Sequence, residues 1–161
     1  MPRAEAEVAI DAPIGLVWRV MLDLDAYPAW NPFIVRIDSP ADRPARIGDD
    51  LGLHVRFRGG LRVRTRERIT RLEPPAATGP RREAALEYEF RGPLAALGLV
   101  RGRRLQSLEE LAPGTTRYRT RERLTGALAV LVPASALRDG FERHAAALRA
   151  RAEGLRGAAE R

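Results

Sequence analysis

The sequence of 161 residues lacks cysteine and lysine, so all 28 of its basic residues are arginine. Without cysteine, the chain forms no disulfide and offers no thiolate as a nucleophile or metal ligand. Without lysine, it makes no Schiff base and has no P-loop lysine to bind a phosphate. The absence of cysteine is compatible with a reducing compartment, and we expect a cytoplasmic protein.

Long apolar runs are also missing from the sequence. No segment approaches the roughly 20 apolar residues that cross a bilayer. The start, MPRAEAEVAI, has no apolar stretch of a signal peptide before a small-residue cleavage site. We therefore expect no stable membrane insertion. The length and the 45% of hydrophobic residues predict one folded domain with a hydrophobic core.

The net charge of +7 has two interpretations. One is a nucleic-acid or anionic-membrane partner, and the other is a coding preference for arginine and alanine. We favour the second because arginines are spread from Arg3 to Arg161 and usually alternate with other residues. No aromatic residues interleave with the predicted arginine rows to form a base-stacking surface, so we expect no nucleic-acid partner.

Alternation with a period of two predicts a sheet. Residues 4–10 alternate between apolar and acidic side chains, which is typical of a half-buried strand. The same period returns in the middle of the chain and predicts about six more strands, at 33–38, 50–57, 61–72, 83–90, 101–111 and 115–126. Arginines occupy one face of several of these strands, which is typical of an antiparallel sheet with one wet face. Three glutamates are expected opposite some of these arginines, namely Glu87, Glu89 and Glu109.

Apolar residues at helical spacing predict a helix near each end of the chain. The first covers 11–22 and has Pro13 in its first turn. The second covers 134–161, with an apolar stripe of Leu137, Phe141, Ala145, Leu148, Ala152 and Leu155. Strands in the middle and helices at the ends predict an α+β fold with a mostly antiparallel sheet.

The stretch DLDAYPAWNPF, residues 23–33, combines helix-starting acids, two prolines and three aromatic rings. The prolines limit it to about one turn of helix. The rings of Tyr27, Trp30 and Phe33 are too large and apolar for a plain surface loop. Either they belong to the core or they contact a ligand.

The order of elements and several motifs resemble the SRPBCC superfamily, also called START-like or helix-grip, and within it the polyketide cyclase/dehydrase-like proteins. The matching motifs are AP before the first helix with Val17 and Trp18, YPAWNPF at 27–33, GLVRG at 98–102, the strand at 115–126, and GFERHAAALRARAE at 140–153.

The resemblance implies a helix-grip fold over residues 1–156, with 157–161 as a short tail. In this fold a curved seven-stranded antiparallel sheet wraps around a long C-terminal helix, and two short helices follow the first strand. An apolar cavity lies between sheet and helix, with YPAWNPF over one end. Applied to this sequence, the resemblance implies as ligand-binding residues Tyr27, Trp30, Phe33, Leu53, Val55, Phe57, Tyr88, Phe90, Leu97, Arg104, Tyr118, Thr120, Glu122, Leu137 and Phe141.

Three polar residues are candidates for chemistry at such a cavity. Glu122 shares a strand face with Tyr118 and Thr120, and a carboxylate on an apolar face needs a partner or a raised pKa. Arg104 on the neighbouring strand is a possible partner, so the alternative role for both is a structural ion pair. His144 flanks the cavity side of the long helix, and its alternative role is a buried structural histidine.

Other chemistries find little support in the sequence. His54 points to the opposite face of its strand from Leu53, so it does not join His144. Two separated histidines without cysteine predict no metal site, and we expect no cofactor. None of the serines lies in a Gly-x-Ser-x-Gly setting that would mark a nucleophile.

Three functions are therefore compatible with the sequence. The first, which we favour, is binding of a small hydrophobic or aromatic ligand of lipid, quinone, polyketide or isoprenoid type by a monomer or homodimer. The second is an enzyme resembling polyketide cyclases/aromatases, with Glu122 or His144 as general acid or base. The third is a protein-interaction module that uses the arginine faces.

Overall fold

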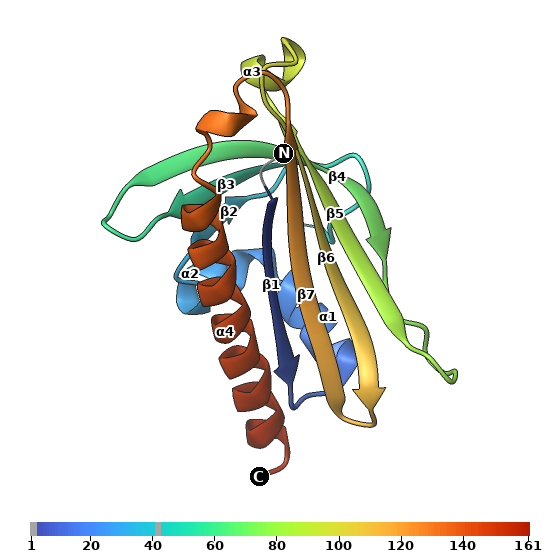
Figure 1. Cartoon of the computed structure of the whole chain (residues 1–161). Coiled ribbons are helices and arrows are strands. Elements are labelled where there is room, and N and C mark those ends of the chain that lie inside the picture. The colour runs from blue at the N-terminus through green and yellow to red at the C-terminus, as the bar shows by residue number, and fades with distance from the viewer. Residues whose placement is uncertain (1–2, 41–42) are drawn as a thin grey trace.

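The structure, a computed structural model, describes residues 3–40 and 43–161, which form one antiparallel sheet and several helices (Figure 1). Seven strands of this described region lie in the order β1-β7-β6-β5-β4-β3-β2, so the first and last strands of the chain are neighbours. The strands are β1 (Arg3–Ile10), β2 (Ile34–Asp38), β3 (Asp50–Arg56), β4 (Arg62–Glu73), β5 (Glu83–Arg91), β6 (Arg101–Ala112) and β7 (Thr115–Thr125).

The helices occupy the connections and the C-terminus. Two of them, α1 and α2, follow the first strand, as predicted. The helical segments are α1 (Ile14–Leu22), η1 (Leu24–Ala26), α2 (Tyr27–Trp30), α3 (Pro93–Ala96), η2 (Ala129–Leu131) and α4 (Ala134–Ala159). None of the helices in residues 3–40 and 43–161 combines the length and apolar character needed to cross a membrane.

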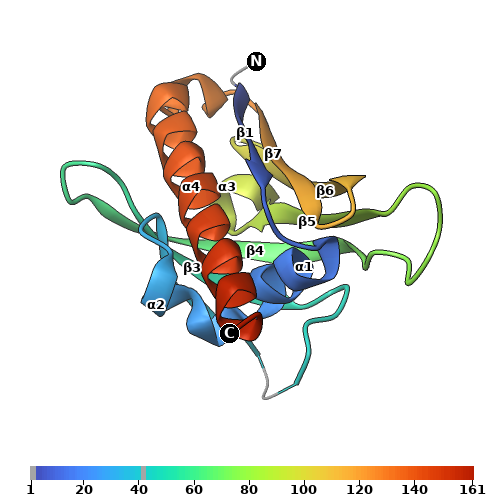
Figure 2. The ribbon, with the colours of Figure 1, turned by 90° about the horizontal axis from the view of Figure 1, so that it is seen from below.

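The sheet curls around α4, which confirms the predicted α+β helix-grip fold (Figures 1 and 2). Register shifts occur in three strand pairs, between Ile34 and Arg36, between Ile69 and Arg71, and between Glu110 and Ala112. Such bulges bend a strand and increase its twist, so they help the sheet to curve. The predicted stripe of α4 faces the core, with Phe141, Ala145, Leu148 and Ala152 buried.

Ion pairs cover the outer face of the sheet. The three glutamates expected opposite arginines all form ion pairs on this face, two of them with an arginine of a neighbouring strand and Glu89 with an arginine of its own strand. The pairs are Glu87 with Arg103 at 3.8 Å, Glu89 with Arg91 at 3.5 Å, and Glu109 with Arg117 at 2.8 Å. Exposed pairs of this kind contribute little stability each, about 0–1 kcal/mol. Their main consequence is a charged outer face on the sheet.

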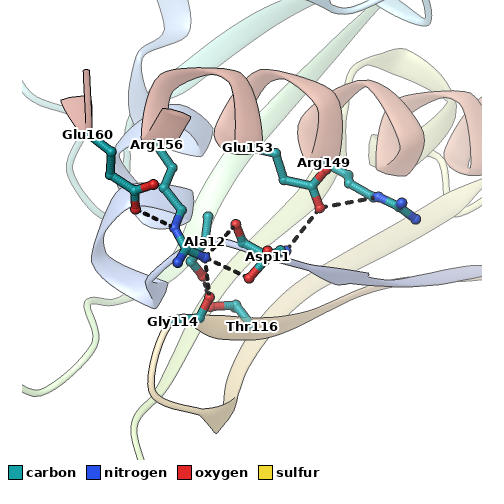
Figure 3. A network of polar contacts seen from close by, with 8 residues as sticks. All are labelled: Asp11, Ala12, Gly114, Thr116, Arg149, Glu153, Arg156 and Glu160. Carbon is teal, nitrogen blue, oxygen red and sulfur yellow. Dashed lines mark hydrogen bonds and ion pairs between the residues drawn. The ribbon is translucent and has the colours of Figure 1, made fainter. Parts of the chain in front are cut away.

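A polar network fixes the C-terminal half of α4 to the sheet (Figure 3). Arg156 Nη1 lies 2.6 Å from Asp11 Oδ1 and donates to the Gly114 carbonyl oxygen at 3.3 Å. The backbone N–H of Asp11 donates to Glu153 Oε1 at 3.0 Å. This network joins the helix to the end of β1 and to the β6–β7 hairpin.

Candidate functional site

A cavity of about 520 Å³ lies between the sheet and the N-terminal half of α4. This volume falls within the range of about 300–1,000 Å³ that is usual for small-molecule sites. Most of its lining is apolar, from β3, β4, β5 and α4. The residues expected at a ligand site that do line it are Phe33, Leu53, Val55, Phe57, Phe90, Arg104, Glu122, Leu137 and Phe141. Their contact with a ligand remains a prediction.

Arg104 on β6 is a buried cation in the cavity wall, with 4% of its surface exposed. Its Nε donates to Thr120 Oγ1 at 3.0 Å, and its guanidinium carbon lies 4.4 Å from the centre of the Phe141 ring. Its Nη2 is buried and has no hydrogen-bond partner among residues 3–40 and 43–161. An unpaired buried donor costs about 1–3 kcal/mol, more when charged. Arg104 therefore brings a buried positive charge to the cavity wall.

Glu122 is the cross-strand neighbour of Arg104 on β7. Burial, followed by the nearby charge of Glu67, raises the pKa of its carboxyl group, Arg104 opposes both, and the net result is a pKa of about 7. Space for the carboxylate comes from Gly102, because a Cβ atom there would lie 3.0 Å from Glu122 Oε1. Near neutral pH this carboxyl group therefore exists in both protonation states and can donate or accept a proton.

Glu67 on β4 is a second cavity carboxylate, and it was not among the predicted site residues. Thr65 Oγ1 donates to Glu67 Oε1 at 3.2 Å, and burial raises the pKa of Glu67. The sequence carried a signal for it. If Arg66 and Arg68 point outward, alternation places Thr65 and Glu67 inward.

Several expected ligand residues lie elsewhere in the structure. Four are fully buried in the core and do not line the cavity, namely Tyr27, Tyr88, Tyr118 and Thr120. Trp30 packs partly buried against the core, its ring centre 4.8 Å from that of Tyr27. Leu97 was expected to line the cavity, but it is 71% exposed and outside the lining, because it follows the short helix α3 that turns it outward.

His144 was expected to flank the cavity, and the structure corrects this. The residue is completely buried and is not in the cavity lining. Its Nδ1 lies 2.7 Å from Asn31 Nδ2, while Asn31 Oδ1 accepts the N–H groups of Phe33 and Ile34 at 3.0 Å each. Burial, followed by the charge of Arg104, holds the pKa of His144 well below its usual range. It is a neutral structural partner of the WNPF motif.

The structure shows where the aromatic rings of residues 23–33 lie. Tyr27 is core, with its hydroxyl donating to the Met21 carbonyl oxygen at 3.0 Å. Phe33 is buried and also forms part of the cavity wall, where its ring packs edge-on against Phe57 and Phe141. The motif therefore links the core to one wall of the cavity.

The described residues contain no cluster of three or more histidine, aspartate or glutamate side chains placed to hold a metal ion. What the cavity offers is one buried guanidinium, two carboxylates with raised pKa and a large apolar wall. Such an arrangement suits an apolar molecule that carries oxygen atoms at one end.

A curved sheet gripping a helix around an apolar cavity defines the helix-grip class of proteins. Residues 1–153 match the model of the family described as polyketide cyclase / dehydrase and lipid transport, and the chain belongs to this family. The sequence matches no curated protein.

Solved structures from this superfamily share the fold. A hypothetical protein from Helicobacter pylori aligns with a TM-score of 0.70 at 12% identity, over 93% of this chain and 87% of its own. A START superfamily protein from Mycobacterium smegmatis aligns with a TM-score of 0.65 at 19% identity, over 95% and 98%. The di-domain ARO/CYC StfQ from the steffimycin biosynthetic pathway aligns with a TM-score of 0.67 at 14% identity, over 95% of this chain and 46% of its own.

Proposed function

We propose that this protein binds a small, largely apolar molecule in the cavity between the sheet and α4. The apolar body of the ligand packs against the β3, β4 and α4 walls. Its oxygen-bearing end accepts a hydrogen bond from Arg104. It also accepts a hydrogen bond from protonated Glu122 or donates one to ionised Glu122. The observation that carries the proposal is the apolar cavity of about 520 Å³ with the buried guanidinium group of Arg104 in its wall.

The energetics favour an oxygenated ligand over a pure hydrocarbon. Apolar burial supplies about 25 cal/mol per Å² before the costs of association. A hydrogen bond to a charged group adds about 1.5–3 kcal/mol, which corresponds to roughly ten- to a hundredfold in affinity. Arg104 and Glu122 therefore select the polar end of the ligand. The apolar walls accept apolar groups of several shapes.

Isothermal titration calorimetry with 2-naphthol and 2-naphthoate tests this proposal. We expect both to bind, and we expect Arg104→Gln to weaken binding of the naphthoate about tenfold or more. Arg119→Gln, which changes an arginine of the outer face, is the matched control and should have no effect.

A second variant tests the place of binding. Leu137→Trp fills the cavity and should abolish binding, whereas Leu111→Trp, at an exposed position away from the cavity, should not. Binding that survives Leu137→Trp would contradict the proposal.

A second candidate function is an enzyme similar to the aromatase/cyclases, and one observation favours it. The pKa of Glu122 lies at about 7, where a general acid or base works best at neutral pH. In this function Glu122 removes a proton next to a carbonyl group of the substrate, and Arg104 stabilises the oxygen of the resulting enolate.

Deuterium exchange at the methyl group of 2-acetylnaphthalene measures this proton abstraction directly. We expect the protein to accelerate exchange with an apparent pKa near 7, and Glu122→Gln to remove the acceleration while the ketone still binds. Binding of the ketone without any acceleration would leave the protein a binding module and would refute the enzymatic role.

A further inference from the structure

The exposed apolar side chains of this protein gather in three connections of the fold. They lie after the β3–β4 turn, in the β5–β6 connection that contains α3, and in the β7–α4 connection that contains η2. Leu97, Val130 and Leu131 have 71–75% of their surface exposed. Among the described large apolar residues that are exposed, Val63 lies on β4 directly after the first connection, and Ile47 and Leu111 lie apart from all three.

The three connections surround one opening. Leu61, Leu94 and Leu131, one residue from each connection, line the same cavity. The N–H of Leu128 donates to the Leu99 carbonyl oxygen at 2.9 Å, which joins the second connection to the third. Figure 1 shows α3 beside the segment that leads into α4 at one end of the molecule. We call this ring of exposed apolar side chains the apolar rim; its members are Leu61, Val63, Leu94, Leu97, Leu128, Val130 and Leu131.

Charge is segregated around the apolar rim. Residues 56–66, 91–104 and 123–138 contain five, four and two arginines and no aspartate or glutamate, although Arg58, Arg64, Arg91 and Arg103 pair with acids outside these stretches. Arg62 and Arg101, beside the first two parts of the rim, are exposed and form no ion pair with any described residue. The sequence interpretation of evenly spread arginines therefore misses a local excess of positive charge at the mouth of the cavity.

We propose that the apolar rim docks the protein reversibly on an anionic phospholipid bilayer. Leucine and valine side chains enter the interface between headgroups and acyl chains, and the flanking arginines contact the anionic headgroups. A bilayer fits this surface better than an acidic protein does, because the rim encircles an opening to an apolar cavity. An apolar ligand then moves between bilayer and cavity without crossing water. Docking itself does not depend on the identity of that ligand.

Vesicle co-sedimentation measures this docking with defined lipids. The wild-type protein should bind vesicles of phosphatidylcholine with phosphatidylglycerol more tightly than vesicles of phosphatidylcholine alone, and higher salt should weaken binding. Leu97→Ser/Val130→Ser should weaken binding more than about tenfold, since about two buried methylene groups suffice for that change. Neither residue lines the cavity, so binding of 2-naphthoate should be unchanged. The matched control is Ile47→Ser/Leu111→Ser.

A second pair of variants tests the charge. Arg62→Gln/Arg101→Gln should weaken binding to anionic vesicles about fivefold per arginine and reduce the preference for them. The control Arg46→Gln/Arg161→Gln removes the same charge elsewhere and should have a smaller effect. The proposal would be overturned if the wild-type protein bound neither type of vesicle. It would also be overturned if the rim variants and their control variants bound vesicles equally well. Dimer formation through the rim without vesicle binding, seen by size-exclusion chromatography, would also overturn it.

Discussion

Replacement of Glu122 by glutamine should stabilise the protein, and the gain should depend on pH. The folded structure raises the pKa of this carboxyl group from its usual 4.5 to about 7. The folded state therefore binds more protons than the unfolded state between these two values. Because stability falls with rising pH wherever the folded state holds more protons, the ionised Glu122 costs the wild-type protein stability above about pH 5.

The magnitude of this cost follows from the difference between the folded and unfolded pKa values of Glu122. Each pH unit corresponds to about 1.4 kcal/mol, so the full cost reaches about 3 kcal/mol once the pH exceeds 7. At pH 5 it is below about 1 kcal/mol, because the folded state is still protonated and this pH lies only slightly above the unfolded pKa of 4.5. Glutamine keeps the shape of the protonated acid and removes this cost. Glu122→Gln should therefore raise the free energy of unfolding by about 3 kcal/mol at pH 8 and by little at pH 5.

Urea denaturation at pH 5 and pH 8 measures both values by linear extrapolation. Asp50→Asn is the control, because the hydrogen bond and charge of Arg68 lower the pKa of Asp50, and this variant should not stabilise the protein at pH 8. An unchanged or lower stability of Glu122→Gln at pH 8 would mean that the carboxylate is a satisfied partner of Arg104. The reasoning about the cavity would then be wrong.

Further expectations concern how the core holds one cavity wall. Gly140→Ala should destabilise the protein by about 1–3 kcal/mol, because the added Cβ would lie 2.2 Å from Phe33 Cε2. Gly154→Ala should stabilise the protein by about 0.5–1 kcal/mol, because there is free space around this helical glycine. Thermal unfolding that shifts in the same direction for both would refute this packing. Asn31→Ala should cost about 3 kcal/mol, because it leaves buried partners, His144 among them, without hydrogen bonds. A loss below about 0.5 kcal/mol in urea would contradict the assigned role of Asn31.

The sequence predicted the sheet well because alternation decides which face of a strand is buried. The inward positions of β3 and β5 and the apolar stripe of α4 followed from spacing alone. The same rule held for Glu122 on β7. It applies equally to Glu67 on β4, which alternates with the outward arginines of that strand.

Positions outside regular strands were harder to predict, because no periodicity fixes them. His144 lies on the buried side of α4, yet helical spacing does not say whether that part of the helix faces the cavity or α2. Leu97 belongs to an irregular connection, where sequence alone does not place a side chain. Asn31 and His144 lie far apart in the sequence, and their hydrogen bond depends on how α2 packs on α4. This packing exists only in the folded protein.

The central claim is that the cavity, and not the charged outer face, binds the ligand. An NMR titration of the 15N-labelled protein with 2-naphthoate tests it most directly, because each shifted amide signal locates the contact. The account predicts the largest shifts around Leu53 on β3, Arg104 on β6, Glu122 on β7 and Leu137 on α4, with saturation at one equivalent. Shifts confined to outer-face residues such as Arg119, or none with either 2-naphthoate or 2-naphthol, would contradict it.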